Sequence, residues 1–426
     1  MGKVHYLNSH LDKFREKSEV KIELEDLREY KTQFNFTEIQ KDTFKDVFWP
    51  KGHVCEGQSI ELRDYQVQVI NEFLKNPQSI QEVATGAGKT IMTAALSKSV
   101  ESYGRSIVIV PNKSLVSQTE EDYVNMGLDV GVYFGDRKEY FKQHTICTWQ
   151  SLNVLMKNTK SGVADVTIQD FIEDVVCVMV DEVHMAKADA LKTLLTGIMA
   201  RVPIRWGLTG TVPKEPFEFQ ALKCSLGPVI NQLSASELQD RGVLAQCHVN
   251  IVQLVDHAEF SNYQSELKFL LEEPDRLSAI ASLVAHVNDT GNTLVLVDRV
   301  AAGHALIERL GDQAVFVSGA TKAGARQDEY DEIATSTGKI IVATYGVAAV
   351  GINIPRIFNL VLIEPGKSFV RVIQSIGRGI RKAEDKDFVQ VWDITSRCKF
   401  SKRHLTERKK YYKEASYPFT IDKITY

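Results

Sequence analysis

The fold of this chain is indicated most clearly by the segment Val83-Ala84-Thr85-Gly86-Ala87-Gly88-Lys89-Thr90. The short segment 79–83 before it is compatible with a strand, and the segment 91–100 after it has the pattern of a helix. Two glycines allow the backbone between them to curl, so that successive N–H groups point at phosphate oxygens. The helix N-terminus adds positive potential at the same place. The stretch therefore predicts a phosphate-binding loop between a strand and a helix.

Two side chains of this loop would bind a nucleotide directly. Lys89 can bridge the β- and γ-phosphates of a nucleoside triphosphate, and the hydroxyl of Thr90 can bind Mg²⁺. The strict form of the motif has a glycine at position 83, where this chain has valine. The alternative is a glycine-rich turn that contains a lysine by chance, and the flanking strand and helix argue against it.

Short apolar segments alternate with helical segments from residue 60 onward. The first series of predicted strands covers 79–83, 107–110, 146–148 and 175–180. The second series covers 248–255, 293–297, 314–317, 339–343, 359–363 and 388–392. Strands rich in β-branched residues that alternate with helices are typical of parallel sheets buried on both faces. We therefore expect two α/β domains, at 58–227 and 228–426, after an N-terminal accessory region at 1–57.

The two ends of the chain differ from these domains. Residues 1–57 combine charges of both signs with aromatic side chains, which form a small core, pack on the next domain or stack on nucleic acid. The segment 397–413 has eight Lys or Arg residues and one Glu. It forms either a phosphate-binding helix or a solvated helix with Leu405 and one of Tyr411 and Tyr412 packed inward.

Composition excludes several classes of protein. The 426 residues include 51 basic and 55 acidic side chains, a net charge of -4, and 44% are hydrophobic. A disordered chain, a disulfide-stapled miniprotein and a uniformly basic coat protein are excluded, although a local basic groove is not. The six cysteines form no C-x-x-C pair, so we expect reduced thiols and no zinc site. We find no signal peptide and no apolar run of roughly 20 residues, and we expect a soluble cytoplasmic protein that does not contact membranes.

An acidic pair, Asp181-Glu182, follows the predicted strand 175–180 and begins the sequence Asp181-Glu182-Val183-His184. Carboxylates at the end of a buried strand are typical of a metal-nucleotide site. Asp181 would hold Mg²⁺, and Glu182 would orient or deprotonate the attacking water. The alternative is a solvated strand end, which the upstream phosphate loop makes the weaker interpretation.

At this point the sequence resembles the superfamily 2 helicases over about residues 60 to 395. Leu62-Arg63-Asp64-Tyr65-Gln66 resembles their adenine-recognising segment, and Leu208-Thr209-Gly210-Thr211 resembles their motif III. The segment 374–381 matches their motif VI, Q-x-x-G-R-x-x-R. The resemblance implies two tandem RecA-like domains with parallel sheets and an ATP site that uses Mg²⁺. The implied ATP-binding residues are Arg63, Gln66, Thr85, Gly86, Ala87, Gly88, Lys89, Thr90, Gly351 and Asn353. The implied coupling residues are His184, Thr209, Thr211 and Gln374.

Motif VI would supply positive charge to the phosphoryl transition state. Its spacing puts Gln374, Gly377, Arg378 and Arg381 on one helix face. A guanidinium from a facing domain stabilises the negative charge that spreads over the equatorial oxygens. We expect Arg381 to act as the arginine finger and Arg378 as a second phosphate contact. The alternative is two arginines on a solvated helix.

The resemblance also implies contacts to a nucleic-acid strand, for which a structural role in a loop is the alternative. The implied contact residues are Pro111, Asn112, Lys113, Gly135, Arg137, Thr148, Gln150, Ser151, Arg299, Ser318, Gly319 and Thr344. Contacts of this kind go to the sugar-phosphate backbone and are largely independent of sequence.

The forms D-E-V-H and L-T-G-T resemble the DNA-acting branch, and the layout resembles the phage recombination helicases. We therefore expect an ATP-dependent DNA helicase, active as a monomer, that unwinds or branch-migrates forked or four-way DNA through closure of its two domains. An RNA helicase and a double-strand translocase without strand separation are alternatives. A P-loop switch protein that does not couple to nucleic acid is an alternative of another class.

Overall fold

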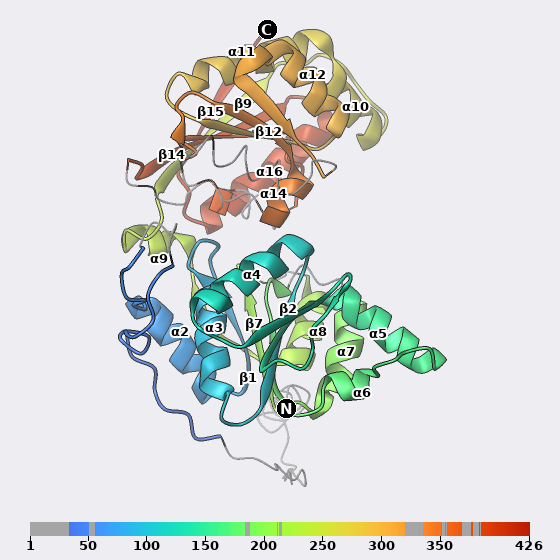
Figure 1. Ribbon diagram of the computed structural model, residues 1–426. Helices are drawn as coiled ribbons and strands as arrows, with labels where there is room; N and C mark the ends of the chain where they lie inside the picture. Colours follow the sequence, from blue (N-terminus) through green and yellow to red (C-terminus); the bar gives the residue numbers. More distant parts are fainter. Residues whose placement is uncertain are drawn as a thin grey trace, which may run out of the picture. The chain divides into compact units, whose positions relative to one another are not determined.

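The computed structural model describes residues 34–50, 56–183, 188–210, 212, 215–319, 332, 335–351, 354, 356–368, 376–377, 383 and 385–426. The chain forms two compact units, the first ending at Leu233 and the second starting at Ser234 (Figure 1). Each unit is a parallel sheet with helices on its faces, so the predicted α/β class is confirmed.

The first unit contains an eight-stranded sheet in the order β4-β3-β5-β2-β6-β7-β1-β8. Its strands are β1 (Gln78–Val83), β2 (Arg105–Val110), β3 (Val130–Phe134), β4 (Arg137–Lys138), β5 (His144–Thr148), β6 (Val175–Val180), β7 (Ile204–Thr209) and β8 (Val229–Leu233). All pairs are parallel except the β3–β4 hairpin. The central strands are almost fully buried, because helices cover both faces of the sheet.

Eight helical segments lie in the described part of the first unit. They are α2 (Asp64–Lys75), α3 (Lys89–Val100), α4 (Lys113–Asn125), α5 (Trp149–Ser161), α6 (Ile168–Phe171), α7 (Ala188–Thr196), the 3₁₀ turn η2 (Ile198–Arg201) and α8 (Pro216–Leu226). In Figure 1, α2 and α3 lie on one face of the sheet, and α5, α7 and α8 lie on the other. The second face holds a core that includes Leu152, Phe171 and Leu194.

The second unit contains a seven-stranded sheet, parallel in every pair, in the order β11-β12-β10-β13-β14-β9-β15. Its strands are β9 (Gln246–Leu254), β10 (Thr293–Val297), β11 (Ala314–Val317), β12 (Ile340–Thr344), β13 (Asn359–Ile363), β14 (Phe388–Ser396) and β15 (Phe419–Ile424). Its helices are α9 (Ala235–Asp240), α10 (Tyr263–Glu272), α11 (Pro274–Asn288), α12 (Val300–Leu310), η3 (Gly311–Gln313), α14 (Tyr345–Gly351) and α16 (Lys399–Glu414). Within this unit, α10, α11 and α12 cover one face of the sheet, and α14 and α16 lie on the other (Figure 1).

The observed sheets contain five strands that were not predicted, namely β3, β4, β7, β8 and β15. Strand β8 pairs with β1, so the first unit runs to Leu233, whereas the expected domain boundary followed residue 227. Strand β15 pairs with β9 and was not predicted. It lies at an edge of the sheet, is exposed along most of its length and lacks the apolar run that marks the buried strands.

The described aromatic residues of the N-terminal region pack on the first unit. The rings of Phe34 and Phe36 both contact Tyr103, at centroid distances of 5.2 and 5.4 Å, and Phe36 also approaches Trp206. The hydroxyl of Tyr103 donates to the carbonyl of Asn35 and accepts from its N–H. These rings therefore have the packing role that was one of the three alternatives for this region.

The basic C-terminal segment forms α16, and one of its arginines is fully buried. Leu405 and Tyr412 face inward as one interpretation expected, and Arg408 is buried beside them. Its guanidinium donates to both carboxylate oxygens of Asp393, at 2.8 and 2.9 Å, and Tyr412 donates to the same carboxylate. The helix is thus anchored to β14 by a buried ion pair.

Among the described residues, no helix is long and apolar enough to cross a membrane.

Candidate nucleotide site and strand-contact edge

The loops that follow three neighbouring strands of the first unit carry the nucleotide motifs. Strand β7 lies between β6 and β1, and all three are parallel. The carboxyl ends of parallel strands meet at one edge of a sheet. The phosphate loop, the acidic pair and the Thr209-Gly210 segment therefore converge there, although they are far apart in the sequence.

The phosphate loop has the backbone conformation that its glycines permit. Gly86 has a φ of 89° and Gly88 a φ of 80°, both in the left-handed region that disfavours other residues. Gly88 is also the N-cap of α3, and a Cβ there would lie 2.7 Å from the side-chain nitrogen of Gln66. Lys89 begins the helix, so the first N–H groups of α3 face the loop.

Lys89 is mostly buried and forms an ion pair with Glu182. Its Nζ is 3.2 Å from Oε1 of Glu182 and 3.4 Å from the carbonyl oxygen of Val83. The side chains of Lys89 and Glu182 are only 9% and 11% exposed. The lysine is thus held at the mouth of the phosphate loop by the second carboxylate of the acidic pair.

Glu182 connects two of the converging loops. Its Oε2 accepts a hydrogen bond from the N–H of Gly210 at 3.4 Å, directly after β7, while Oε1 contacts Lys89. Its φ of 49° lies in the left-handed region, which costs a residue with a side chain of order 1 kcal/mol or more. The surrounding contacts keep it there, and strain of this kind is concentrated at functional sites.

Asp181 is fixed by its backbone and supplies a carboxylate beside the loop. Its N–H donates to the carbonyl of Ile109 at 2.9 Å, and its Oδ1 accepts from the N–H of Glu182 at 2.9 Å. A carboxylate and the hydroxyl of Thr90 are oxygen ligands of the kind that Mg²⁺ prefers, and the ion takes few protein ligands. The side chains at this edge therefore fit the predicted Mg²⁺ site.

Gln66 is bonded to the phosphate loop in the structure. Its Nε2 donates to the carbonyl of Ala87 at 3.1 Å, and its Oε1 accepts from the N–H of Arg63 at 2.9 Å. Tyr65 donates to the same carbonyl at 3.1 Å. The amide that was expected to pair with adenine thus also supports the loop, and the sequence alone did not indicate this contact.

Several expected residues cannot be placed in this site. The predicted roles of His184, Thr211, Asn353, Gln374, Arg378 and Arg381 fall on residues outside those that the structure describes. Thr209 is fully buried at the end of β7, and Gly351 ends α14. For these residues the coupling and phosphate-binding roles stay predictions.

The remaining strands of the first sheet bring together the residues expected to contact nucleic acid. Strands β2 and β5 are paired, with Val110 opposite Thr148, so the segments that follow them are neighbours. Asn112 caps α4 by accepting from the N–H of Leu115, and Thr148 caps α5 by accepting from the N–H of Ser151. Two helix N-termini therefore lie side by side, and each favours a phosphate group.

Two side chains connect and extend this edge. Gln150 Nε2 donates to the carbonyl of Pro111 at 3.2 Å, which ties the starts of α4 and α5 together. Lys113 is exposed, and its Nζ lies 5.4 Å from the centre of the Phe134 ring. Gly135 turns the chain after β3 with a φ of 54°. We call the surface formed by 111–113, 135 and 148–151 the strand-contact edge.

Arg137 has a different environment from the one expected. Its guanidinium donates to both oxygens of Glu120, at 2.7 and 2.5 Å, and also contacts Glu139. These two carboxylates raise the pKa of Arg137 and offset its charge. A phosphate contact at this position would have to compete with Glu120, so Arg137 is the weakest of the expected contacts in this unit.

The second unit has a comparable edge. Strands β11, β12 and β10 are neighbours, and Ser318-Gly319, Thr344 and Arg299 lie at or directly after their carboxyl ends. The hydroxyl of Thr344 accepts from the N–H of Val347 at 3.4 Å. Arg299 lies 3.5 Å from Glu272 and is one-third exposed. These residues therefore share one edge of the second sheet.

The second unit contains a buried polar network that was not predicted from the sequence. Arg276 is fully buried, and its guanidinium contacts Asp256 at 3.3 Å and Glu364 at 2.7 Å. Glu364 follows β13 with a φ of 43°, and burial raises the pKa of its carboxyl. Its position directly after the predicted strand 359–363 could have indicated it, because Glu182 lies just after β6 in the same way.

Fold and site together define a P-loop nucleoside triphosphatase built from two parallel-sheet units. Residues 59–214 match the family "Type III restriction enzyme, res subunit", and residues 275–383 match "Helicase conserved C-terminal domain". The chain belongs to superfamily 2 of the helicases and is an ATP-hydrolysing helicase, which confirms the expected enzyme class.

Known relatives cover most of the chain. It is 26% identical over 396 residues to the ATP-dependent DNA helicase uvsW of Enterobacteria phage T4, covering 88% of this chain and 76% of the relative. It is 22% identical over 374 residues to the DNA 3'-5' helicase XPB of Kineococcus radiotolerans, covering 84% and 64%. The structure of S. cerevisiae Dbp5 bound to RNA and ADP BeF3 has a TM-score of 0.58 at 15% identity, covering 84% and 89%, and confirms the RecA-like fold.

Proposed function

We propose that this protein is a DNA helicase that couples ATP hydrolysis to movement along a DNA strand. The observation that carries the proposal is the convergence of Lys89, Glu182 and Gly210 at the carboxyl ends of β1, β6 and β7. The proposal that the strand is DNA is supported by two curated relatives that are both DNA helicases by name.

The residues of the first unit have distinct roles in this proposal. Lys89 would bind the β- and γ-phosphates. Glu182, whose Oε1 lies 3.2 Å from Lys89 Nζ, would orient the attacking water and accept its proton. Mg²⁺, held by Thr90 and Asp181, would neutralise charge on the phosphates. Arg63, Gln66 and the loop 85–88 would position the nucleotide.

The same carboxylate connects hydrolysis to the rest of the unit. Glu182 contacts both Lys89 and the N–H of Gly210, so a change at the phosphates alters the contacts of the segment after β7. Thr209, Thr211 and His184 would transmit this change. In the second unit, Gln374, Arg378 and Arg381 would respond to the γ-phosphate together with Gly351 and Asn353. Hydrolysis would then weaken the hold between the two units.

The strand would contact both units through sugar and phosphate. In the first unit, paired helix N-termini at Asn112 and Thr148 would bind phosphate oxygens. In the second unit, the segments at Arg299, 318–319 and Thr344 would do the same. We propose forked or four-way DNA as the substrate, action as a monomer, and activity in the cytoplasm of a bacterial host, by analogy with the phage relative.

The test is the rate of ATP hydrolysis with no polymer, single-stranded DNA, forked DNA, four-way DNA and RNA. We expect DNA to raise the rate several-fold and branched DNA to raise it most. Lys89→Ala should abolish turnover with every polymer, and Lys98→Ala is the matched control, because Lys98 lies on an exposed part of the same helix.

Three outcomes would contradict parts of the proposal. Stimulation by RNA alone would indicate an RNA helicase. A rate that is indifferent to every polymer would indicate a nucleotide switch. Triplex displacement by the protein without strand displacement would indicate a double-strand translocase.

A further inference from the structure

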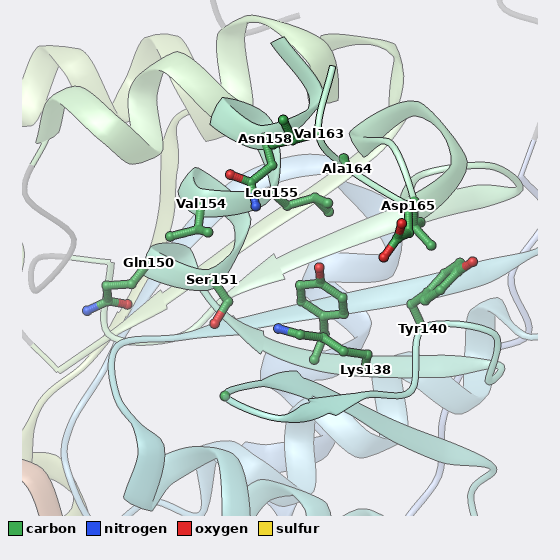
Figure 2. Close-up of a pocket in the computed structure, with 13 residues that line it drawn as sticks. Lys138, Tyr140, Gln150, Ser151, Val154, Leu155, Asn158, Val163, Ala164 and Asp165 are labelled. Carbon is green, nitrogen blue, oxygen red and sulfur yellow. The ribbon is translucent and has the colours of Figure 1, made fainter. Parts of the chain in front are cut away.

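A cavity of about 550 Å³ lies in the first unit beside the strand-contact edge (Figure 2). It is open to solvent and is bounded by the β3–β4 hairpin on one side and by α5 and the loop 163–166 on the other. The volume lies within the range of roughly 300 to 1,000 Å³ that is usual for small-ligand sites. None of the proposed nucleotide contacts of the ATP site lines it.

The walls of the cavity are mostly aromatic and aliphatic. Tyr133 and Tyr140 contribute rings from the hairpin side, and Val154 and Leu155 contribute apolar side chains from α5. In Figure 2 the Tyr140 side chain lies near Asp165, and the Asn158 amide lies near Leu155. The site therefore combines flat apolar walls with a few polar groups.

Apolar side chains are unusually exposed around this cavity. Val154 and Val163 line it and are 56% and 71% exposed. Phe141 is 74% exposed, and its ring centre lies 3.9 Å from that of Tyr140. Exposed apolar side chains that gather at one place indicate a binding surface rather than a packed core.

The cavity is continuous with the strand-contact edge. Gly135, Gln150 and Ser151 belong both to its lining and to that edge. Ser151 donates its N–H to the cap of α5, and Gln150 bonds to the segment at the start of α4. A strand whose phosphates lie at these helix N-termini would therefore carry its bases past the mouth of the cavity.

We propose that this cavity takes up one unpaired nucleobase of the bound strand. A base has flat faces that stack on aromatic rings and polar edges that an amide or carboxylate can bind. Lys138, whose Nζ lies 4.4 Å from the centre of the Tyr133 ring, supplies positive charge for the adjoining phosphate. Stacking of this kind accepts any base, so it suits a protein that moves along a strand.

A base bound in this cavity would add a contact to the strand beyond those made to its sugar-phosphate backbone. A base held between Tyr140 and the α5 side of the cavity cannot pair with a complementary strand. The inference rests on the proposed function, because it requires that the strand-contact edge binds nucleic acid.

The test compares two single strands of equal length, oligo-dT and an abasic strand with the same sugar-phosphate backbone. Because stacking of one base is worth about 1–3 kcal/mol, we expect the wild-type protein to bind oligo-dT roughly 5- to 150-fold more tightly than the abasic strand. Tyr140→Ala should remove most of this difference and leave affinity for the abasic strand unchanged, because Tyr140 lines the cavity. Tyr140→Phe should retain it.

The structure supplies suitable controls. Phe217 is 73% exposed in the same unit but does not line the cavity, so Phe217→Ala should behave as the wild type does. The backbone at residues 140–142 is held by Arg105, whose guanidinium donates to the carbonyls of Tyr140 and Lys142. Removing a ring should therefore leave the chain in place, and thermal unfolding of each variant checks this.

Each result has a distinct meaning. Equal affinity of the wild type for both strands overturns the proposal and assigns the exposed apolar side chains to a protein partner instead. A variant that loses affinity for both strands equally also overturns it, because the loss is then in the backbone contact. If neither strand binds or raises the ATPase rate, the proposed function itself fails.

Discussion

Replacing Glu182 by glutamine separates the chemical role of this side chain from its structural role. The variant keeps the size of the side chain and an oxygen that can accept from Gly210. It removes the negative charge that lies 3.2 Å from Lys89 Nζ. Both side chains are about nine-tenths buried, so little water is available to replace the lost carboxylate.

The two effects of Glu182→Gln have opposite signs. Breaking a buried ion pair at one partner costs about 3–5 kcal/mol, and the residual exposure of this pair suggests the lower end, about 3 kcal/mol. The phosphates of ATP restore negative charge beside Lys89, so part of this loss should return on binding. Turnover should nevertheless fall roughly 10²- to 10⁴-fold, because the general base is absent.

The assay is thermal unfolding with and without a non-hydrolysable ATP analogue and Mg²⁺, alongside the DNA-stimulated ATPase rate. We expect the free variant to melt below the wild type and to gain more from the analogue than the wild type does. Glu308→Gln, on an exposed position of α12, is the control. Turnover within threefold of the wild type would refute the role of Glu182 as the base, and a smaller gain from the analogue would refute its pairing with Lys89.

Three further variants test the fold around the sites. Burial, with a smaller contribution from Glu121, raises the pKa of Asp122 from 3.8 to about 6. Because the folded pKa exceeds the unfolded one, the protein loses stability as pH rises between these two values. The free energy of unfolding of Asp122→Asn relative to the wild type, measured in urea, should therefore be higher at pH 7.5 than at pH 4.5, by up to roughly 3 kcal/mol. The same relative value at both pH values would contradict this. Gly88→Ala should weaken binding of the ATP analogue roughly 2- to 10-fold, because its Cβ would displace the Gln66 Nε2 that donates to the loop carbonyl of Ala87, a hydrogen bond worth about 0.5–1.5 kcal/mol. Gly127→Ala has the same positive φ with no atom within 4 Å and should bind normally, so equal binding by both variants would contradict the clash. Arg408→Met should lower the free energy of unfolding by about 3–5 kcal/mol by leaving Asp393 unpaired, and an added Asp393→Leu should restore part of it; no restoration would show that packing, not charge, is lost.

The parts of the fold with strong local patterns could be predicted. Strands 175–180, 293–297, 314–317 and 359–363 have the bounds expected, because each is a short and largely apolar run followed directly by a polar residue. The exposed edge strand β15 was missed, since it lacks the apolar run that marks the buried strands. Strand β8 was not predicted, and its residues lie beyond the expected boundary at 227, because pairing with β1 is a long-range contact.

The residue types of the candidate site could be predicted, but not its contacts. The glycines and Lys89 are specified by short-range backbone geometry, and the acidic pair by its position after a strand. The pairing of Lys89 with Glu182 depends on strand order, which no local pattern gives. Arg408 was expected on a solvated or phosphate-binding helix, yet it is buried against Asp393, because the partner lies on another element. The cavity beside α5 also combines residues from distant segments and has no motif.

The central claim is that chemistry at Lys89 drives movement along DNA, and the rate of strand separation on forked DNA tests it most directly. With ATP and Mg²⁺, the wild-type protein should release the displaced strand. Lys89→Ala should bind the same fork with nearly unchanged affinity and release no strand above the rate seen without ATP. Strand release by Lys89→Ala at a rate near that of the wild type would contradict the claim.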